Sequence, residues 1–117
     1  MNLFTLKYSL ERDFRPFTRQ ELLTLPRDRL GVYAFWLVDD ADEIQACLYV
    51  GISTTCMRRR LLSHLSNESN EGLRRQFRMF GDSVRFTAAF TATAEQTREL
   101  EAALIRDWQS AHNVRHR

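Results

Sequence analysis

The chain has 117 residues, 44% of them hydrophobic and 27% charged, with a formal net charge of +2 at pH 7. This length supports one hydrophobic core and is too short for two, so we expect a single domain over 1–117. No apolar run approaches a membrane span, 1–5 lack signal-peptide features, and Cys47 and Cys56 form no CxxC pair, so we expect a cytoplasmic protein with reduced thiols and no membrane partner.

The first half of the chain predicts an edge strand, a short helix and a hairpin. Residues 2–9 alternate loosely between apolar and polar, as an edge strand does. Thr18-Arg19-Gln20-Glu21 has the form of a capping box and predicts a short helix. Residues 31–38 are rich in aromatic and β-branched side chains and predict a strand, which the acidic stretch 39–46 connects to a returning strand over 47–50.

The second half predicts, in order, a turn, a helix, a polar loop, an arginine-rich helix, a third strand and a long final helix. These segments are 52–55, 56–65, 66–70, 71–80, 83–91 and 94–111. In the third strand, Arg85 and Thr87 alternate with apolar residues. Thr93-Ala94-Glu95-Gln96 is a second capping box. The order β-β-α-α-β-α predicts a small α+β domain with a three-stranded, largely antiparallel sheet flanked by helices.

Two tripeptides at the ends of the predicted hairpin strands are near mirror images of each other. They are Gly31-Val32-Tyr33 and Tyr49-Val50-Gly51. In a hairpin they place two phenol hydroxyls on neighbouring strands, and each glycine lets another backbone or a ligand come close. Two tyrosines presented together on a rigid ribbon indicate a site.

One glutamate of the final helix falls inside the apolar stripe. At about 100° per residue, Glu101 lies in the arc formed by Leu100, Leu104 and Trp108, where a solvated carboxylate does not belong. A buried carboxylate needs compensation by an arginine, a proton or a metal ion. On periodicity alone, an ion pair with an arginine is the simpler explanation.

The helix after the hairpin separates its consecutive arginines. Leu61 and Leu65 define its core side, and Arg60 and His64 lie one turn apart on a flank of that side. Arg59 points away toward solvent. Arg60 and His64 are therefore the pair that can reach toward the hairpin.

Taken in order, these elements resemble the motifs of the GIY-YIG nuclease domain. They are the two tripeptides, Arg60 with His64, Glu101 followed by Leu104-Ile105, and Asn113. The resemblance spans about 30–114 and implies a GIY-YIG-like fold, with 30–114 as the catalytic core and 1–29 as an N-terminal extension packed on it. The family's usual spacing fits Arg59, whereas the helical face and the spacing to His64 favour Arg60, so both stay candidates for the catalytic arginine.

The resemblance implies a metal-dependent endonuclease that hydrolyses DNA phosphodiester bonds with a single Mg²⁺ or Mn²⁺ ion. Glu101 would be the metal ligand, and Arg60 would hold the scissile phosphate. Tyr33 would be the general base, which requires that Arg60 or the metal lower its pKa from about 10. The residues expected to position water or phosphate, assist proton transfer and fix the geometry are Tyr49, His64 and Asn113.

The arginine distribution gives mild support for a nucleic-acid partner. Acidic residues outnumber basic ones in 1–50, whereas arginines outnumber acidic residues in 51–117. The expected nucleic-acid-binding residues are Arg59, Arg74, Arg75 and Arg78. A solvated helix explains the last three equally well. Cutting two strands with one site would favour a homodimer or sequential nicks, and a protein partner also stays open.

Two other functions stay open at this stage. One is a nucleic-acid-binding module that kept the fold and lost catalysis. The other is a small interaction protein in which both tripeptides belong only to the hairpin and core, and Glu101 forms a salt bridge. The residues do not decide between DNA and RNA, single and double strands, or one biological pathway and another.

Overall fold

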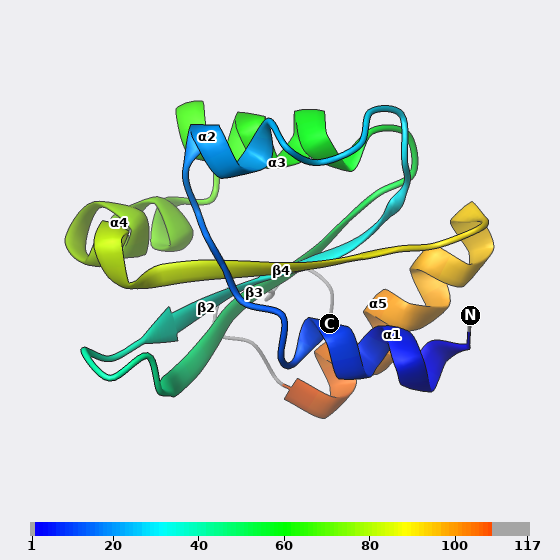
Figure 1. Ribbon diagram of the computed structural model, residues 1–117, viewed down its shortest axis with the longest axis horizontal. Coiled ribbons are helices and arrows are strands. Elements are labelled where there is room, and N and C mark those ends of the chain that lie inside the picture. The colour runs from blue at the N-terminus through cyan, green and yellow to red at the C-terminus, as the bar shows by residue number, and fades with distance from the viewer. Residues whose placement is uncertain (1, 109–117) are drawn as a thin grey trace.

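The computed structural model describes residues 2–108, which are built around a four-stranded antiparallel sheet with the strand order β1-β4-β2-β3 (Figure 1). The strands are β1 (Arg15–Pro16), β2 (Gly31–Val38), β3 (Ile44–Ser53) and β4 (Val84–Phe90). The helices are α1 (Leu3–Leu10), α2 (Arg19–Leu22), α3 (Met57–Ser66), α4 (Glu71–Phe80), the 3₁₀ helix η1 (Gly81–Ser83) and α5 (Ala94–Trp108). The predicted α+β class is confirmed, with one strand more than expected. Over these residues, none of the helices combines the length and the apolar character that crossing a membrane requires.

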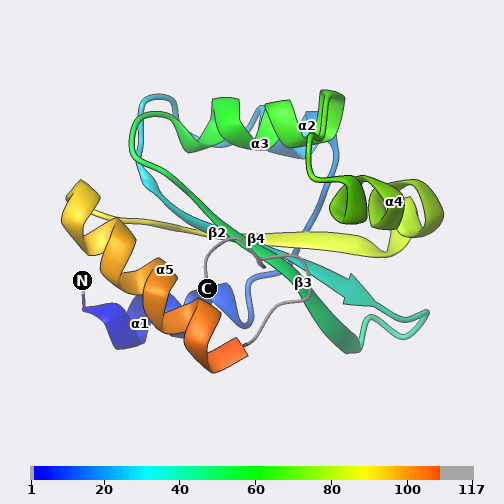
Figure 2. The ribbon, with the colours of Figure 1, turned by 180° about the vertical axis from the view of Figure 1, so that it is seen from behind.

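The sheet is covered by helices on both faces. Helices α2, α3 and α4 lie on one face, and α1 and α5 lie on the other (Figures 1 and 2). Alternating residues of β2 serve the two layers: Tyr33 and Phe35 face α3, whereas Val32 and Ala34 face α5. A strand buried on both sides has a continuous apolar sequence, which explains the run from Gly31 to Val38.

The hairpin strands extend further than the sequence predicts. Strand β3 begins at Ile44 because Asp39 closes the turn: its Oδ1 accepts hydrogen bonds from the Ala41 and Glu43 amides, each at 2.9 Å. At the other end, Ser53 still pairs with Gly31. The predicted returning strand over 47–50 is therefore only the middle of β3.

The N-terminal segment is a helix, so the edge strand predicted over 2–9 is wrong. Asn2 caps α1 by accepting a hydrogen bond from the Thr5 amide at 2.9 Å. Leu6 and Leu10 lie one turn apart and are both buried, so the helical period overrides the loose alternation. The edge position is taken by β1, whose Arg15 pairs with Phe86 of β4.

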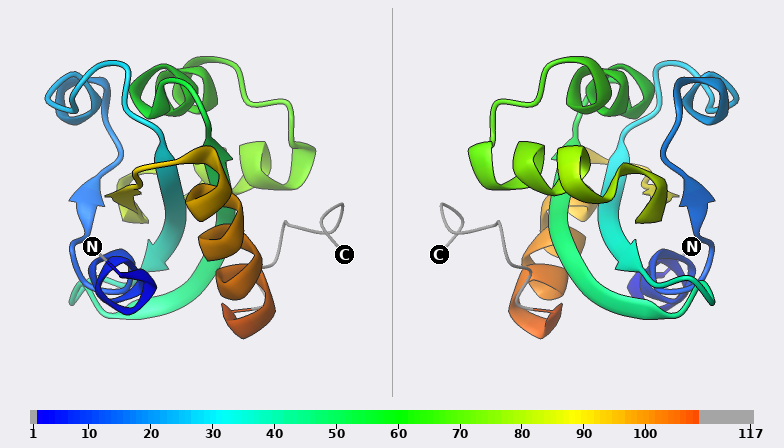
Figure 3. Two further views of the ribbon diagram at one scale, coloured as in Figure 1. Left: turned by 90° about the vertical axis from the view of Figure 1, so that its right-hand side faces the viewer. Right: turned by 90° about the vertical axis from the view of Figure 1, so that its left-hand side faces the viewer.

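Both capping boxes begin helices as predicted. The Thr18 side chain accepts from the Glu21 amide at the start of α2, and Thr93 accepts from the Gln96 amide at 3.1 Å at the start of α5. Helices α2 and α3 lie side by side on the same face of the sheet (Figure 3). The predicted end of the final helix at 111 lies outside the described residues.

Candidate active site

The register of the hairpin brings the two tyrosines together. Tyr33 pairs with Gly51, and Phe35 pairs with Tyr49, so both tyrosines stand on the face that α3 covers. Their ring centroids are 6.4 Å apart. The Tyr33 ring lies over Gly51, where an added Cβ would overlap the ring and its hydroxyl. The glycine of the second tripeptide therefore makes room for the tyrosine of the first.

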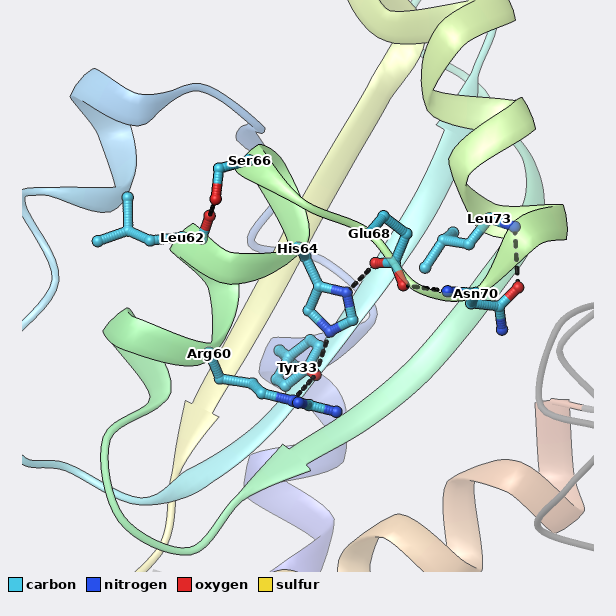
Figure 4. A network of polar contacts seen from close by, with 8 residues as sticks. All are labelled: Tyr33, Arg60, Leu62, His64, Ser66, Glu68, Asn70 and Leu73. Carbon is cyan, nitrogen blue, oxygen red and sulfur yellow. Dashed lines mark hydrogen bonds and ion pairs between the residues drawn. The ribbon is translucent and has the colours of Figure 1, made fainter.

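Helix α3 brings two polar side chains to the Tyr33 hydroxyl (Figure 4). His64 is buried, and its Nε2 lies 2.6 Å from the Tyr33 hydroxyl oxygen. Arg60 donates from Nε to the same oxygen at 3.3 Å. Arg59 is exposed and lines a different pocket, with Arg27, Asp28 and Cys56. Of the two candidate arginines, Arg60 is the one that contacts the tyrosine.

The network continues to a residue that the sequence analysis did not identify. The buried Glu68 forms a short hydrogen bond through Oε2 to His64 Nδ1, and its Oε1 accepts from the Asn70 amide at 2.8 Å. The segment 66–70 reads as a polar loop, which conceals this role. The signal that could have found Glu68 is its spacing of four residues from His64, which lets a carboxylate just past the end of α3 reach back to an imidazole in the last turn of the helix.

Tyr33 is completely buried, and its environment determines its protonation. Burial raises the pKa of Tyr33, Tyr49 raises it further, and the positive charge and hydrogen bond of Arg60 only partly oppose this. Arg60 therefore acts in the expected direction, but desolvation outweighs it. The hydroxyl is neutral in this arrangement, contrary to the lowered pKa that the sequence analysis requires of a general base.

The charged neighbours of Tyr33 keep their charges. The electrostatic interaction with Tyr33 raises the pKa of Arg60, and Tyr49 adds to this effect. Burial by itself raises the pKa of Glu68, but hydrogen bonds from His64 and the Asn70 amide outweigh it, so the net pKa is lowered. The network thus joins a carboxylate at one end to a guanidinium at the other.

A small polar pocket opens beside this network. Its volume is about 30 Å³, which accommodates a water molecule but no organic ligand. Its lining residues are Arg60, Ser63, His64, Asn67, Glu68 and Ser69. The pocket therefore brings solvent to the edge of the network, while Tyr33 itself stays covered.

Glu101 comes from α5, not from the strand and helix that carry Tyr33, Arg60 and His64. Glu101 is partly buried on α5, beside Leu100, which packs on the face of the sheet opposite to the tyrosines. Helix α5 contacts β3, the edge strand that carries Tyr49. Asn113 lies outside the described residues. The metal-binding role of Glu101 and the role of Asn113 stay predictions.

The predicted nucleic-acid-binding arginines gather on α4. Arg74, Arg75 and Arg78 are exposed, and together with Glu71 they line one small surface pocket. Asn70 caps this helix, because its side-chain oxygen accepts from the Leu73 amide at 3.0 Å. The arginine helix therefore begins directly after the residue that holds Glu68.

No family model matches the sequence, and no curated protein sequence does. Solved structures do match. Two of them are crystal structures of the GIY-YIG N-terminal endonuclease domain of UvrC from Thermotoga maritima, in each of which one tyrosine is replaced by phenylalanine and the catalytic divalent cation is bound. Both are 23% identical to this chain, cover 81% of it and 92% of their own length, and superpose with TM-scores of 0.59 and 0.58. The chain therefore has a GIY-YIG-like fold.

Proposed function

We propose that this protein is a divalent-cation-dependent endonuclease that hydrolyses phosphodiester bonds in nucleic acid, with DNA as its substrate. The observation that carries the proposal is the contact of Tyr33 with both Arg60 and His64, on a fold shared with endonuclease domains. A tyrosine, a guanidinium and an imidazole at one point supply a proton acceptor, a phosphate ligand and a proton relay.

Arg60 is the phosphate ligand in this proposal. Arg60 is an exposed residue, yet its Nε bonds the buried Tyr33 hydroxyl, so the side chain bridges solvent and the network. A phosphate that draws the guanidinium outward would uncover Tyr33 for the attacking water and stabilise the charge that develops on the phosphoryl oxygens. Tyr49, which also interacts with Arg60, would hold the guanidinium in place.

The proposed cation would be held by Glu101. Among residues 2–108, no three His, Cys, Asp or Glu side chains gather as a ready metal site, so a protein-rich coordination shell does not fit. A single carboxylate does fit Mg²⁺ or Mn²⁺, which bind oxygen and keep several waters when phosphate oxygens complete the shell. When bound, the cation would offset negative charge at the scissile phosphate.

The surface of α4 would bind the nucleic-acid backbone. Arg74, Arg75 and Arg78 share one exposed face of α4, the helix that begins directly after Asn70, whose amide holds Glu68. Guanidinium groups bind phosphates in a planar, two-point geometry that carries no sequence information. We therefore expect binding that depends strongly on salt.

A second candidate is a nucleic-acid-binding module of the same fold without catalysis. The complete burial of Tyr33 and its raised pKa favour this candidate, because a general base must reach water. Incubating the purified protein with supercoiled plasmid and with single-stranded DNA, in Mg²⁺, Mn²⁺ or EDTA, separates the two. Cleavage that needs metal and is lost in Arg60→Ala and Glu101→Ala supports the nuclease. Binding without cleavage in either metal supports the module.

A further inference from the structure

The buried carboxylate of Glu68 is fully engaged. Its two oxygens accept from different donors, Oε2 from His64 and Oε1 from the Asn70 amide, and its side chain is 5% exposed. An ionised carboxylate inside a protein is costly unless such partners replace water. Glu68 is therefore held in one position, and it fixes whatever it contacts.

The contact with Glu68 determines which nitrogen of His64 carries the proton. A carboxylate only accepts hydrogen bonds, so His64 Nδ1 must donate to Glu68. In a neutral imidazole the other nitrogen, Nε2, is then an acceptor. The Tyr33 hydroxyl, 2.6 Å from Nε2, must therefore be the donor in that bond, and its oxygen accepts from Arg60. In both hydrogen bonds, Tyr33 to His64 and His64 to Glu68, the donor is therefore the residue on the Tyr33 side.

We propose that Glu68 is a positioning residue that holds His64 in the Nδ1–H tautomer, so that His64 is the final acceptor of the proton released by the attacking water. This inference rests on the proposed nuclease function. Water attacks phosphorus, its P–O bond forms, and the bond from phosphorus to the leaving sugar oxygen breaks. One water proton passes to the Tyr33 oxygen while the Tyr33 proton passes to His64 Nε2. The leaving oxygen takes a proton from solvent, and His64 later returns its proton to solvent.

This arrangement removes the difficulty posed by a buried phenol. A free phenolate in the core would be strongly disfavoured, as the raised pKa of Tyr33 indicates. In the proposed step the phenol loses one proton as it gains another, so no separate phenolate has to form. The positive charge appears on His64, where the Glu68 carboxylate stabilises it, in the manner of the carboxylate in a Ser-His-Asp triad.

The tautomer can be measured without activity. Long-range ¹H–¹⁵N spectra of the wild-type imidazole should show His64 protonated at Nδ1 and not at Nε2 at neutral pH, and Glu68→Ala should abolish this preference. A wild-type protein with His64 protonated at Nε2 alone would overturn the inference whatever the activity.

Kinetics test the charge of Glu68. We expect Glu68→Gln to slow cleavage by about 100-fold with unchanged DNA affinity, because a relay of this kind contributes at least that much. The acidic limb of its pH–rate profile should move to lower pH, since an imidazolium without its carboxylate releases its proton more readily. The titratable and charged groups around His64 are Tyr33 on β2, Tyr49 on β3, Arg60 on α3 and Glu68 itself. Glu43→Gln, an exposed position on the hairpin, removes the same charge and should leave rate and profile unchanged.

The two proposals fail separately. If wild-type protein cleaves nothing but His64 has the Nδ1–H tautomer that Glu68→Ala loses, the nuclease proposal fails and the positioning role of Glu68 is upheld. If wild-type protein cleaves DNA and Glu68→Gln matches it in rate and pH profile, the nuclease stands and the role of Glu68 is refuted.

Discussion

Replacing Gly51 by alanine should disrupt the candidate site although it changes none of the polar residues of that site. The new Cβ would lie 2.5 Å from Tyr33 Cζ and 2.8 Å from Cε2, and nearer still to the hydroxyl oxygen. These distances are shorter than real carbon contacts, so something must move. Tyr33 is completely buried against Phe35 and His64, so its ring has no free space to enter.

The expected cost has two parts. Forcing a methyl group into a well-packed core typically costs about 1–3 kcal/mol. Displacing the Tyr33 hydroxyl from His64 leaves a buried nitrogen without its donor, which costs about 1–3 kcal/mol more. We therefore expect Gly51→Ala to lower the free energy of unfolding by about 2–6 kcal/mol, a large share of the stability of a domain of this size.

Urea denaturation of the variant measures this loss, and Gly81→Ala is the matched control. Gly81 has helical angles (φ −47°, ψ −46°), and a Cβ there would meet nothing within 4 Å. We expect this control to be neutral or to stabilise the protein by about 0.4–1 kcal/mol. The contrary result is a free energy of unfolding of Gly51→Ala within about 0.5 kcal/mol of the wild-type value, well below the cost of overpacking. In that case Tyr33 does not lie over Gly51 and the site has another geometry.

Three further predictions follow from the same structure. Arg60→Ala should slow DNA cleavage by about 100-fold or more in a plasmid assay. Arg59 does not contact Tyr33, so Arg59→Ala should change the rate only a few-fold. The reverse result would assign the catalytic role to Arg59. Replacing Arg74, Arg75 and Arg78 together by alanine should weaken DNA binding and reduce the slope of log K against log salt by about 3, and an unchanged slope would exclude α4 from the interface. Because the pKa of Glu68 is lowered in the folded state, its stabilising contribution is complete above the unfolded value of about 4.3 and is lost as pH falls through the lowered value. Acid titration of Glu68→Gln should therefore show a shallower loss of stability than the wild-type protein, and parallel curves would contradict the ionised pair.

The sequence predicts the central part of the fold well because its signals there are strong. The apolar run of β2 and the capping threonines at Thr18 and Thr93 each lead to the element observed. The N-terminal prediction failed because eight residues with leucines at mixed spacings fit two periods, and burial of Leu6 and Leu10 selects the helical one. Strand β1 has two residues, too few for any pattern, and exists only through its pairing with β4.

The candidate site was predictable where it depends on helical geometry. The helical wheel separates Arg60 and His64 from Arg59, and the structure brings that pair to Tyr33. The wheel does not predict the pKa of Tyr33, because desolvation depends on how helices close over the sheet. The sequence does not predict the role of Glu68, because the residue follows the end of α3, where a polar side chain is normally exposed to solvent.

Asn70 makes two contacts that link the network to α4. Its backbone amide donates to Glu68, and its side-chain oxygen caps the helix that carries the arginines. Contact between a long substrate and α4 would therefore be transmitted to the carboxylate through a single residue. A DNA fragment too short to reach α4 should then be cleaved with a lower kcat as well as a higher KM, because remote binding would help to align the reacting groups. The length of the substrate, and not only its affinity, would set the speed of the chemical step.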